Sequence, residues 1–175
     1  YLEVVTELDL LRLERSLNKV IARHPMLHAI VKADGKQRIL QNVPYYRIKI
    51  QDISCSDKKQ QEEAIQEERN SISHHVFEAE EWPMIGISAL KIENNKHYLF
   101  IEFDMLIADG SSLQIIGNDW MAFYEDENCE LPELKFTFKD YMRGMGELKK
   151  SEIYRRDKNF WMKRVDTFPD APNIP

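Results

Sequence analysis

Apolar residues recur along the chain with two different periods, which separate the expected helices from the expected strands. Positions 10, 13, 17, 20 and 21 are leucine, valine or isoleucine, at the spacing that places one apolar stripe on a helix. Asp9 precedes this stripe and is a favourable N-cap, so a helix is expected from Asp9 to about His24. Positions 98–103 read YLFIEF, apolar on nearly both faces, which is typical of an interior strand covered on two sides.

The same patterns predict the remaining elements. Strands are expected at 1–6, 26–33, 37–41, 46–50 and 84–92, and helices at 57–71, 138–148 and from Ser151. Ser56 is the expected cap of the polar 57–71 helix, and Thr137 that of the 138–148 segment, which Gly144 and Gly146 weaken. Turns are expected at Asp34-Gly35 and at Asn94-Asn95.

The strand at 98–103 leads into Asp104–Ser112, which reads DMLIADGSS and has the form DxxxxDxxS. A helix is expected to follow from about Ser111, with Ser111 and Gln114 as a capping box and Gly110 permitting a tight turn. Its apolar stripe consists of Leu113, Ile116, Trp120 and Phe123. Two carboxylates and a hydroxyl are therefore expected to converge at a strand-to-helix turn, beside N–H groups that favour an anion.

Composition narrows the class of protein. With 175 residues, 43% of them hydrophobic and 31% charged, the chain suits one soluble domain with a real core. A net charge of −6 without a basic stripe argues against a nucleic-acid surface. The sequence has neither a membrane-length apolar run nor a signal-peptide pattern, so a cytoplasmic protein is expected. Cys55 and Cys129 stand apart without a CxxC pair, which indicates neither a disulfide framework nor a zinc site.

The motifs resemble those of heterocyclization domains of nonribosomal peptide synthetases. DxxxxDxxS is similar to the signature of that family, whose condensation-domain relatives carry HHxxxDG in the same loop. Aligned on Asp109-Gly110, this chain has Asp104 and Met105 where a condensation domain has its two histidines. The pair His74-His75 does not match the HHxxxDG motif, because no Asp-Gly follows it at the required distance.

Three further motifs fall in the family's order across almost the whole chain. Residues 23–27 read RHPML, similar to the family's RHxML, and residues 34–37 read DGKQ, similar to its D-G-x-Q turn. Trp82-Pro83 is similar to the W-P that opens the strand pair before the signature. The family's LPxxPxLP run is matched by 168–175 apart from Phe168 and Ile174, which replace leucines.

The resemblance implies a fold similar to chloramphenicol acetyltransferase, an α/β sandwich built as two related halves around a tunnel. Each half has a mixed, mostly antiparallel sheet with helices packed on it. Residues 1–175 are then a single N-terminal subdomain, and 166–175 a proline-rich linker toward a missing C-terminal subdomain. Because the chain starts at Tyr1 without a methionine and ends in prolines, a piece of a longer protein is expected.

The implied reaction condenses a carrier-bound acyl or peptidyl thioester with a Cys, Ser or Thr thioester, then cyclodehydrates the product to a thiazoline or oxazoline. The expected partners are donor and acceptor carrier proteins, which bring phosphopantetheine arms. No cofactor or metal is expected to bind directly, and neither nucleic acid nor a membrane is an expected partner. The isolated chain should be inactive and should self-associate through the apolar face left uncovered.

The catalytic candidates are Asp104, Asp109 and Ser112, which could accept a proton, donate one or assist an oxyanion. Each also has a structural interpretation. An aspartate before glycine commonly holds a turn, which favours that role for Asp109, and Ser112 suits a capping hydroxyl. For Asp104, chemical and structural roles are about equally supported.

The other marked residues are expected to be structural. Arg23, His24 and Gly110 belong to this group, with the arginine and histidine at a helix C-terminus. The remaining histidines show no metal-ligand spacing. The aromatic side chains expected in the core are Trp120, Phe123, Tyr124 and Trp161.

Two other functions remain open from the sequence. The half-fold could be a noncatalytic module that binds carrier proteins. It could also belong to an amide-forming condensation domain with a degenerate motif, which is disfavoured because loss of histidine would not install both Asp104 and Ser112.

Overall fold

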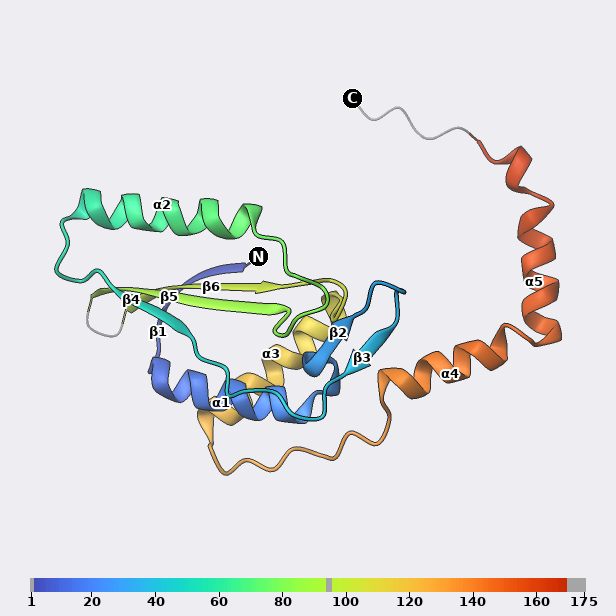
Figure 1. Cartoon of the computed structure of the whole chain (residues 1–175), viewed down its shortest axis with the longest axis horizontal. Coiled ribbons are helices and arrows are strands. Elements are labelled where there is room, and N and C mark those ends of the chain that lie inside the picture. The colour runs from blue at the N-terminus through green and yellow to red at the C-terminus, as the bar shows by residue number, and fades with distance from the viewer. Residues whose placement is uncertain (1, 94–95, 170–175) are drawn as a thin grey trace. The chain divides into compact units, whose positions relative to one another are not determined.

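The computed structural model describes residues 2–93 and 96–169, and the chain divides into two compact units, Tyr1–Pro132 and Glu133–Pro175. The first unit contains both sheets and three α-helices (Figure 1). Its elements are β1 (Leu2–Glu7), α1 (Leu10–Arg23), the 3-10 helix η1 (Pro25–His28), β2 (Ala29–Val31), β3 (Gln37–Ile39), β4 (Lys49–Asp52), α2 (Lys58–His74), β5 (Ile85–Glu93), β6 (Lys96–Phe103) and α3 (Gly110–Glu125).

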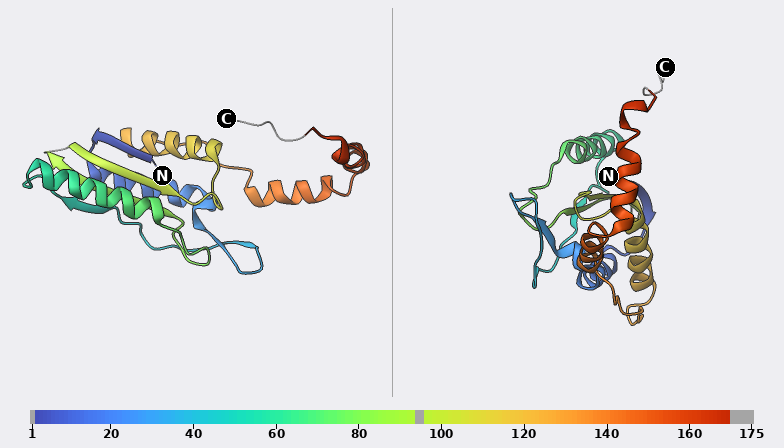
Figure 2. Two further views of the ribbon diagram at one scale, coloured as in Figure 1. Left: turned by 90° about the horizontal axis from the view of Figure 1, so that it is seen from above. Right: turned by 90° about the vertical axis from the view of Figure 1, so that its right-hand side faces the viewer.

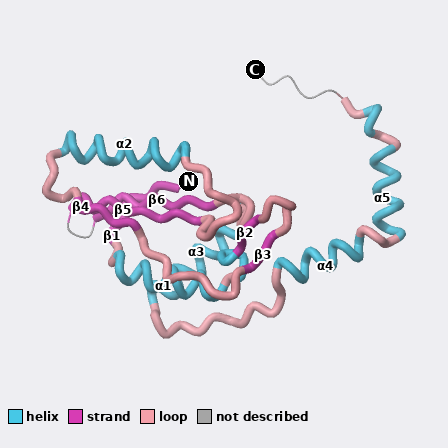
Figure 3. Tube along the Cα trace, viewed as in Figure 1, coloured by secondary structure: helices cyan, strands magenta, loops and turns pink. Residues whose placement is uncertain are grey.

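The main sheet has four strands in the order β1-β6-β5-β4. β6 is antiparallel to both of its neighbours, β1 and β5, whereas β4 runs parallel to β5. β2 and β3 form a separate antiparallel hairpin, and Gly35 in its turn has a φ of 76°, a conformation that favours glycine. The expected mixed, mostly antiparallel sheet and the Asp34-Gly35 turn are thereby confirmed (Figure 3).

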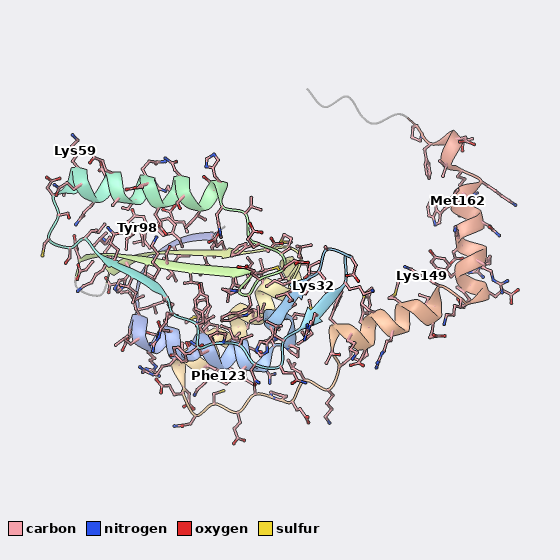
Figure 4. All side chains as sticks on the ribbon, viewed as in Figure 1. Lys32, Lys59, Tyr98, Phe123, Lys149 and Met162 are labelled. Atoms are coloured by element: carbon pink, nitrogen blue, oxygen red, sulfur yellow. The ribbon has the colours of Figure 1, made fainter. Side chains whose placement is uncertain are left out.

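Helices cover the sheet on both faces, and β6 contributes to the core on each side. Leu99 packs into the larger apolar cluster with α1 and α3, whereas Phe100 packs into a second cluster under α2. Figures 1 and 2 show the sheet between these two layers, and Tyr98 and Phe123 mark opposite sides in Figure 4. The prediction that this strand is interior and covered on two sides is confirmed.

The segment expected to be a strand at 46–50 is mostly held by side chains of α1 instead. Asn18 Nδ2 donates to the carbonyl of Tyr46 (2.9 Å), and the Tyr46 N–H donates to Asn18 Oδ1 (2.7 Å). The buried carboxylate of Glu14 accepts the N–H of Ile48 (2.9 Å). Because these backbone groups are occupied, pairing with β5 begins only at Lys49, and the prediction was wrong about where β4 lies.

Two other boundaries differ from those expected. The strand expected at 26–33 begins as the 3-10 turn η1, because Pro25 at its first position suits a helical turn and the Leu27 N–H bonds the carbonyl of His24 (2.9 Å). Asp57, not Ser56, caps α2, since Asp57 and Gln60 form a reciprocal capping box. The expected N-cap of α1, Asp9, is confirmed by its bonds to the Leu11 and Arg12 N–H groups.

The second unit consists of α4 (Phe138–Leu148), α5 (Glu152–Met162) and the 3-10 turn η2 (Val165–Thr167). Thr137 and Asp140 form a capping box for α4, which outweighs its two glycines, and Ser151 caps α5 as expected. Trp161 is not a core residue, because 56% of it is exposed and its ring contacts are with Phe160 and Phe168 of the same unit.

Some predictions fall outside the described residues. These are the turn at Asn94-Asn95, the first residue of the first strand, and most of the proline-rich stretch, residues 170–175. Within the described part of the chain, no helix combines the length and the apolar character needed to cross a membrane.

Burial of the α1 stripe predicts a large stability effect at Leu17. This side chain is fully buried in the main cluster, so Leu17→Ala should lower the free energy of unfolding by about 2–5 kcal/mol. Leu11 on the same helix is 63% exposed, and Leu11→Ala is the matched control, with an expected change within about 0.5 kcal/mol. Urea denaturation followed by circular dichroism measures both, and equal effects would contradict the assigned helix face.

Candidate functional site

The DxxxxDxxS motif occupies the connection between β6 and α3. The Asp104 N–H donates to the Met84 carbonyl (3.0 Å), which continues the β5–β6 pairing by one residue. The chain then turns, since the Ile107 N–H donates to the Asp104 carbonyl (3.1 Å) and the Leu106 N–H donates to Asp104 Oδ1 (2.8 Å). One carboxylate oxygen of Asp104 therefore stabilises the turn. Asp104 is the first residue after β6.

The back of this loop is fixed in the core while its tip faces outward. Ile107 and Ala108 are buried in the main apolar cluster. Gln37 of β3 donates from Nε2 to the Leu106 carbonyl (2.8 Å), which ties the loop to the hairpin. Met105 and Leu106 remain exposed. The motif is thus held in a defined shape by residues between its two aspartates.

Asp109 begins α3 and binds the third residue of the motif. Its Oδ1 accepts both the backbone N–H of Ser112 (2.8 Å) and the Ser112 hydroxyl (2.7 Å). The hydroxyl bond, followed by the backbone bond, lowers the pKa of Asp109 from its ordinary value of 3.8. Asp109 is therefore an anionic N-cap that stabilises the helix start.

This cap corrects the expected start of α3. The predicted capping box of Ser111 and Gln114 is absent from the described structure, because Asp109 already accepts the N–H at its third helical position. Gly110 is the first residue of α3, and a Cβ added there would meet no atom within 4 Å. The entry into the helix therefore does not depend on the conformational freedom of glycine.

The three candidate residues are brought together only in part. Asp109 and Ser112 are in direct contact, whereas the carboxylate of Asp104 accepts a hydrogen bond from Leu106 within its own turn. In the described residues no hydrogen bond joins Asp104 to either of the others. The bonds to both aspartates fall on Oδ1, so Oδ2 of each accepts no hydrogen bond from the described residues. The two differ in burial, since Asp104 is half-buried and Asp109 is exposed.

Arg23 and His24 both bind a residue that sequence reasoning did not single out. Arg23 Nε and His24 Nε2 each lie 2.8 Å from Oδ2 of Asp119, at the middle of α3. All three side chains are mostly buried. The pair therefore joins the end of α1 to the helix that starts with the motif. The available signal was the position of Asp119, which follows Ile116 by three residues and so borders the apolar stripe of α3.

A row of basic side chains on α1 also fixes the segment after α3. Arg12 Nη2 donates to the Glu125 carbonyl (2.7 Å), Arg15 pairs with Glu127 (2.7 Å), and Arg23 Nη2 donates to the Pro132 carbonyl (2.6 Å). Lys19 donates to the carbonyl of Glu127. The segment that follows α3 is thus held along α1.

The described residues contain no group of three or more His, Cys, Asp or Glu side chains placed to hold a metal ion. Cys55 and Cys129 are both free thiols.

The Asp109–Ser112 contact predicts a measurable titration. Because the folded pKa of Asp109 lies below 3.8, the interaction favours the folded state above that pH and is lost as the pH falls through the folded pKa. Ser112→Ala removes the hydroxyl bond but keeps the backbone bond, so the Asp109 midpoint should rise part of the way toward 3.8. NMR titration of the carboxyl carbon measures this, with Ser111→Ala as the control. An unchanged midpoint in Ser112→Ala would contradict the contact.

The shared carboxylate of Asp119 predicts a loss of stability when its charge is removed. Asp119→Asn leaves Arg23 and His24 mostly buried without their anionic partner, so the free energy of unfolding should fall by about 1–3 kcal/mol. Asp157→Asn, at an exposed ion pair on α5, should change it by less than about 0.5 kcal/mol. Chemical denaturation compares the two variants, and similar losses of stability would refute the importance of the contact between Asp119 and the pair Arg23 and His24.

Comparison with known proteins supplies a family. The family model described as "Condensation domain" matches residues 1–175. Bacitracin synthase 1 of Bacillus licheniformis is 31% identical over 173 residues, and pyochelin synthetase PchF of Pseudomonas aeruginosa is 28% identical over 167. These alignments cover 99% and 95% of this chain but only 3% and 9% of the relatives, so the chain spans a small part of their length.

Solved structures agree with the sequence comparison. The EpoB cyclization-docking bidomain from Sorangium cellulosum superposes with a TM-score of 0.93 at 34% identity, over 99% of this chain and 35% of that one. The condensation enzyme VibH shares the fold with a TM-score of 0.69, at 16% identity over 96% of this chain and 39% of that one. Together with the sheet and helix layers described above, the family match over the full length shows that this chain belongs to the condensation-domain family of nonribosomal peptide synthetases.

Proposed function

We propose that the chain is the N-terminal subdomain of a heterocyclization domain. The observation that carries the proposal is Asp104, which stands at the end of β6 where a condensation domain has the first histidine of its motif, with Asp109 and Ser112 completing DxxxxDxxS. The names of similar proteins support it, since they include a phenyloxazoline synthase, MbtB of a Mycobacterium species, and the EpoB cyclization bidomain.

The proposed reaction has two stages. The acceptor amine attacks the carbonyl of the donor thioester, an amide forms, and the donor arm leaves as a thiol that takes the proton lost by the amine. The acceptor's thiol or hydroxyl then attacks the new amide carbonyl. Departure of that oxygen as water leaves a carbon–nitrogen double bond in a thiazoline or oxazoline ring. Each stage requires a group that moves protons at the carbonyl.

Asp104 is the residue we assign to this proton transfer. Its Oδ1 is held by the Leu106 N–H, which fixes the carboxylate, and Oδ2 accepts no hydrogen bond from the described protein. An oriented carboxylate with a free oxygen can accept a proton from the attacking group or, once protonated, give one to departing water. Asp109 and Ser112 serve the same chemistry indirectly, by fixing the helix that follows the loop.

The substrates arrive as thioesters on phosphopantetheine arms, so donor and acceptor carrier proteins are the proposed partners. The chain itself then needs no bound cofactor. Because it covers 35% of the cyclization bidomain it matches, activity is proposed for the complete domain, and the 175-residue chain alone is expected to be inactive.

Reconstitution of the complete domain with loaded carrier proteins tests this function. With a cysteine, serine or threonine acceptor, the product should be one water lighter than the linear amide. Asp104→Asn should slow cyclodehydration by about 100-fold or more, because a positioned acid or base typically contributes that much. Mass spectrometry of the released product measures both steps.

The matched control for this experiment is Asp52→Asn. Asp52 is an exposed aspartate on the edge strand β4, and the complete domain with this substitution should form the ring at the wild-type rate. Linear amide from the wild type would point to plain condensation. Absence of any product with all three acceptors would favour a carrier-binding module, and full cyclisation by Asp104→Asn would remove Asp104 from the chemistry.

A further inference from the structure

Gln37 connects the β2–β3 hairpin to the motif loop. Its side-chain Nε2 lies 2.8 Å from the carbonyl oxygen of Leu106, although the two residues are 69 apart in sequence. A carbonyl oxygen can only accept, so the atom of Gln37 that faces it must be the NH2 nitrogen, which donates. The Leu106 N–H in turn donates to Oδ1 of Asp104 (2.8 Å). Two hydrogen bonds in series therefore connect β3 to the carboxylate of Asp104.

The bond to Asp104 depends on where Leu106 is held, and the side chain of Leu106 does little to hold it. Leu106 is 46% exposed and Met105 is 66% exposed, whereas burial in the core resumes only at Ile107. Among the described residues, the hydrogen bond from Gln37 is the one that reaches Leu106 from outside the loop. Gln37 therefore sets the position of the N–H group that binds the Asp104 carboxylate.

The hairpin that carries Gln37 is itself anchored to the rest of the first unit. Gln37 pairs with Val31 on β2, and the Val31 N–H donates to the carbonyl of Ala79 (2.6 Å). The Ala33 N–H donates to Oε1 of Glu80 in the same segment (2.6 Å). Because β2 is fixed to this segment, β3 presents Gln37 from a defined position, and the bond to Leu106 can orient the loop.

Asp104 is attached from two sides as a result. Its backbone N–H donates to the Met84 carbonyl (3.0 Å), which fixes the main chain at the end of β6. Its carboxylate is fixed separately, by the N–H of Leu106. Loss of the Gln37 amide would leave the first attachment in place and loosen the second. A change at Gln37 is therefore expected to alter the orientation of the carboxylate more than the path of the backbone.

We propose that Gln37 is a positioning residue, which sets the orientation of the Asp104 carboxylate for proton transfer. It acts through Leu106 and needs no contact with the substrate in this role. The inference rests on the proposed heterocyclization, because it concerns the step assigned to Asp104. Proton transfer requires the carboxylate within hydrogen-bond reach of the reacting group, and misplacement of a reacting group by about 1 Å can lower a rate about 100-fold.

The first test compares Gln37→Met and Gln37→Glu in the complete domain with loaded carrier proteins. Methionine has nearly the same length without a donor, and glutamate keeps the shape but presents oxygens to the Leu106 carbonyl. Both variants should lower kcat for ring formation about five- to tenfold, in line with the loss of one hydrogen bond. KM for the loaded acceptor carrier should stay within about twofold of the wild-type value. Gln51→Met, the same substitution at an exposed position of β4, is the control and should form the ring at the wild-type rate.

A double-mutant cycle separates positioning from a general loss of structure. If Gln37 acts through the Asp104 carboxylate, Gln37→Met should lower the rate by less than about twofold once Asp104→Asn is present. A residue that only stabilises the fold would lower the rate by the same factor in both backgrounds. Equal losses in the two backgrounds, or a wild-type kcat in both Gln37 variants while Asp104→Asn is slow, would overturn the proposal.

Hydrogen exchange in the 175-residue chain tests the contact without turnover. Gln37→Met should speed exchange of the Leu106 amide about fivefold or more, while the Ile107 amide, which donates to the Asp104 carbonyl, should exchange as in the wild type. Unchanged exchange at Leu106 would show that Gln37 does not hold the loop, and would overturn the proposal even where ring formation is confirmed.

Failure of the proposed function gives a different result from failure of this inference. In that case the wild-type domain forms no ring, or Asp104→Asn forms it at the wild-type rate, whichever residue stands at position 37. The positioning role then falls with the function on which it rests.

Discussion

The structure depends first on the burial of β6 on both of its faces. A strand of this kind must be covered twice, so the sheet needs α2 on one side and the α1–α3 pair on the other. β6 lies between β1 and β5 and is bonded along both edges. Because both edges of β6 are hydrogen-bonded and both of its faces are covered, the position of its end is fixed, and Asp104 follows directly there. The motif is therefore positioned by the best-constrained element of the first unit rather than by the loop that contains it.

The polar side chains of α1 fix segments of the chain that belong to no sheet. Side chains of this helix bond backbone groups on segments that have no ladder of their own: Asn18 and Glu14 hold residues 46–48, and a basic row holds the chain after α3. Such contacts satisfy backbone groups that would otherwise be left unpaired near the core. Asp119 joins the two systems, because it receives Arg23 and His24 from α1 on the same helix that Asp109 caps. The RHPML element is thus one side of a helix–helix contact.

Local patterns were sufficient wherever a single element determines the outcome. The apolar stripe of α1, its Asp9 cap, the two-sided β6 and the glycine turn of the hairpin follow from spacing and residue type alone. The misplaced boundaries have a common cause, which is competition for the same hydrogen-bonding group. Asn18 takes the backbone of Tyr46 from a possible strand, and Asp109 takes the N–H at Ser112 that a cap at Ser111 would have left free. Asp119 escaped notice for a similar reason, since its partners lie 95 and 96 residues away in sequence. Periodicity along a chain contains no information about such pairings.

The two aspartates of the motif have different surroundings. A carboxylate that accepts two bonds from one serine is stabilised as an anion, so its proton affinity is low and its geometry is fixed. This suits a helix cap and makes Asp109 a weak base. Asp104 also has Oδ1 anchored, by the Leu106 N–H of its own turn, but it is half-buried whereas Asp109 is exposed. Identical side chains five residues apart therefore differ in their partners and in their burial, because one bonds within a turn and the other caps a helix. Under the proposed function, an aspartate in place of the first histidine of a condensation motif would change the group offered to the substrate, while Asp109 still caps the helix that follows.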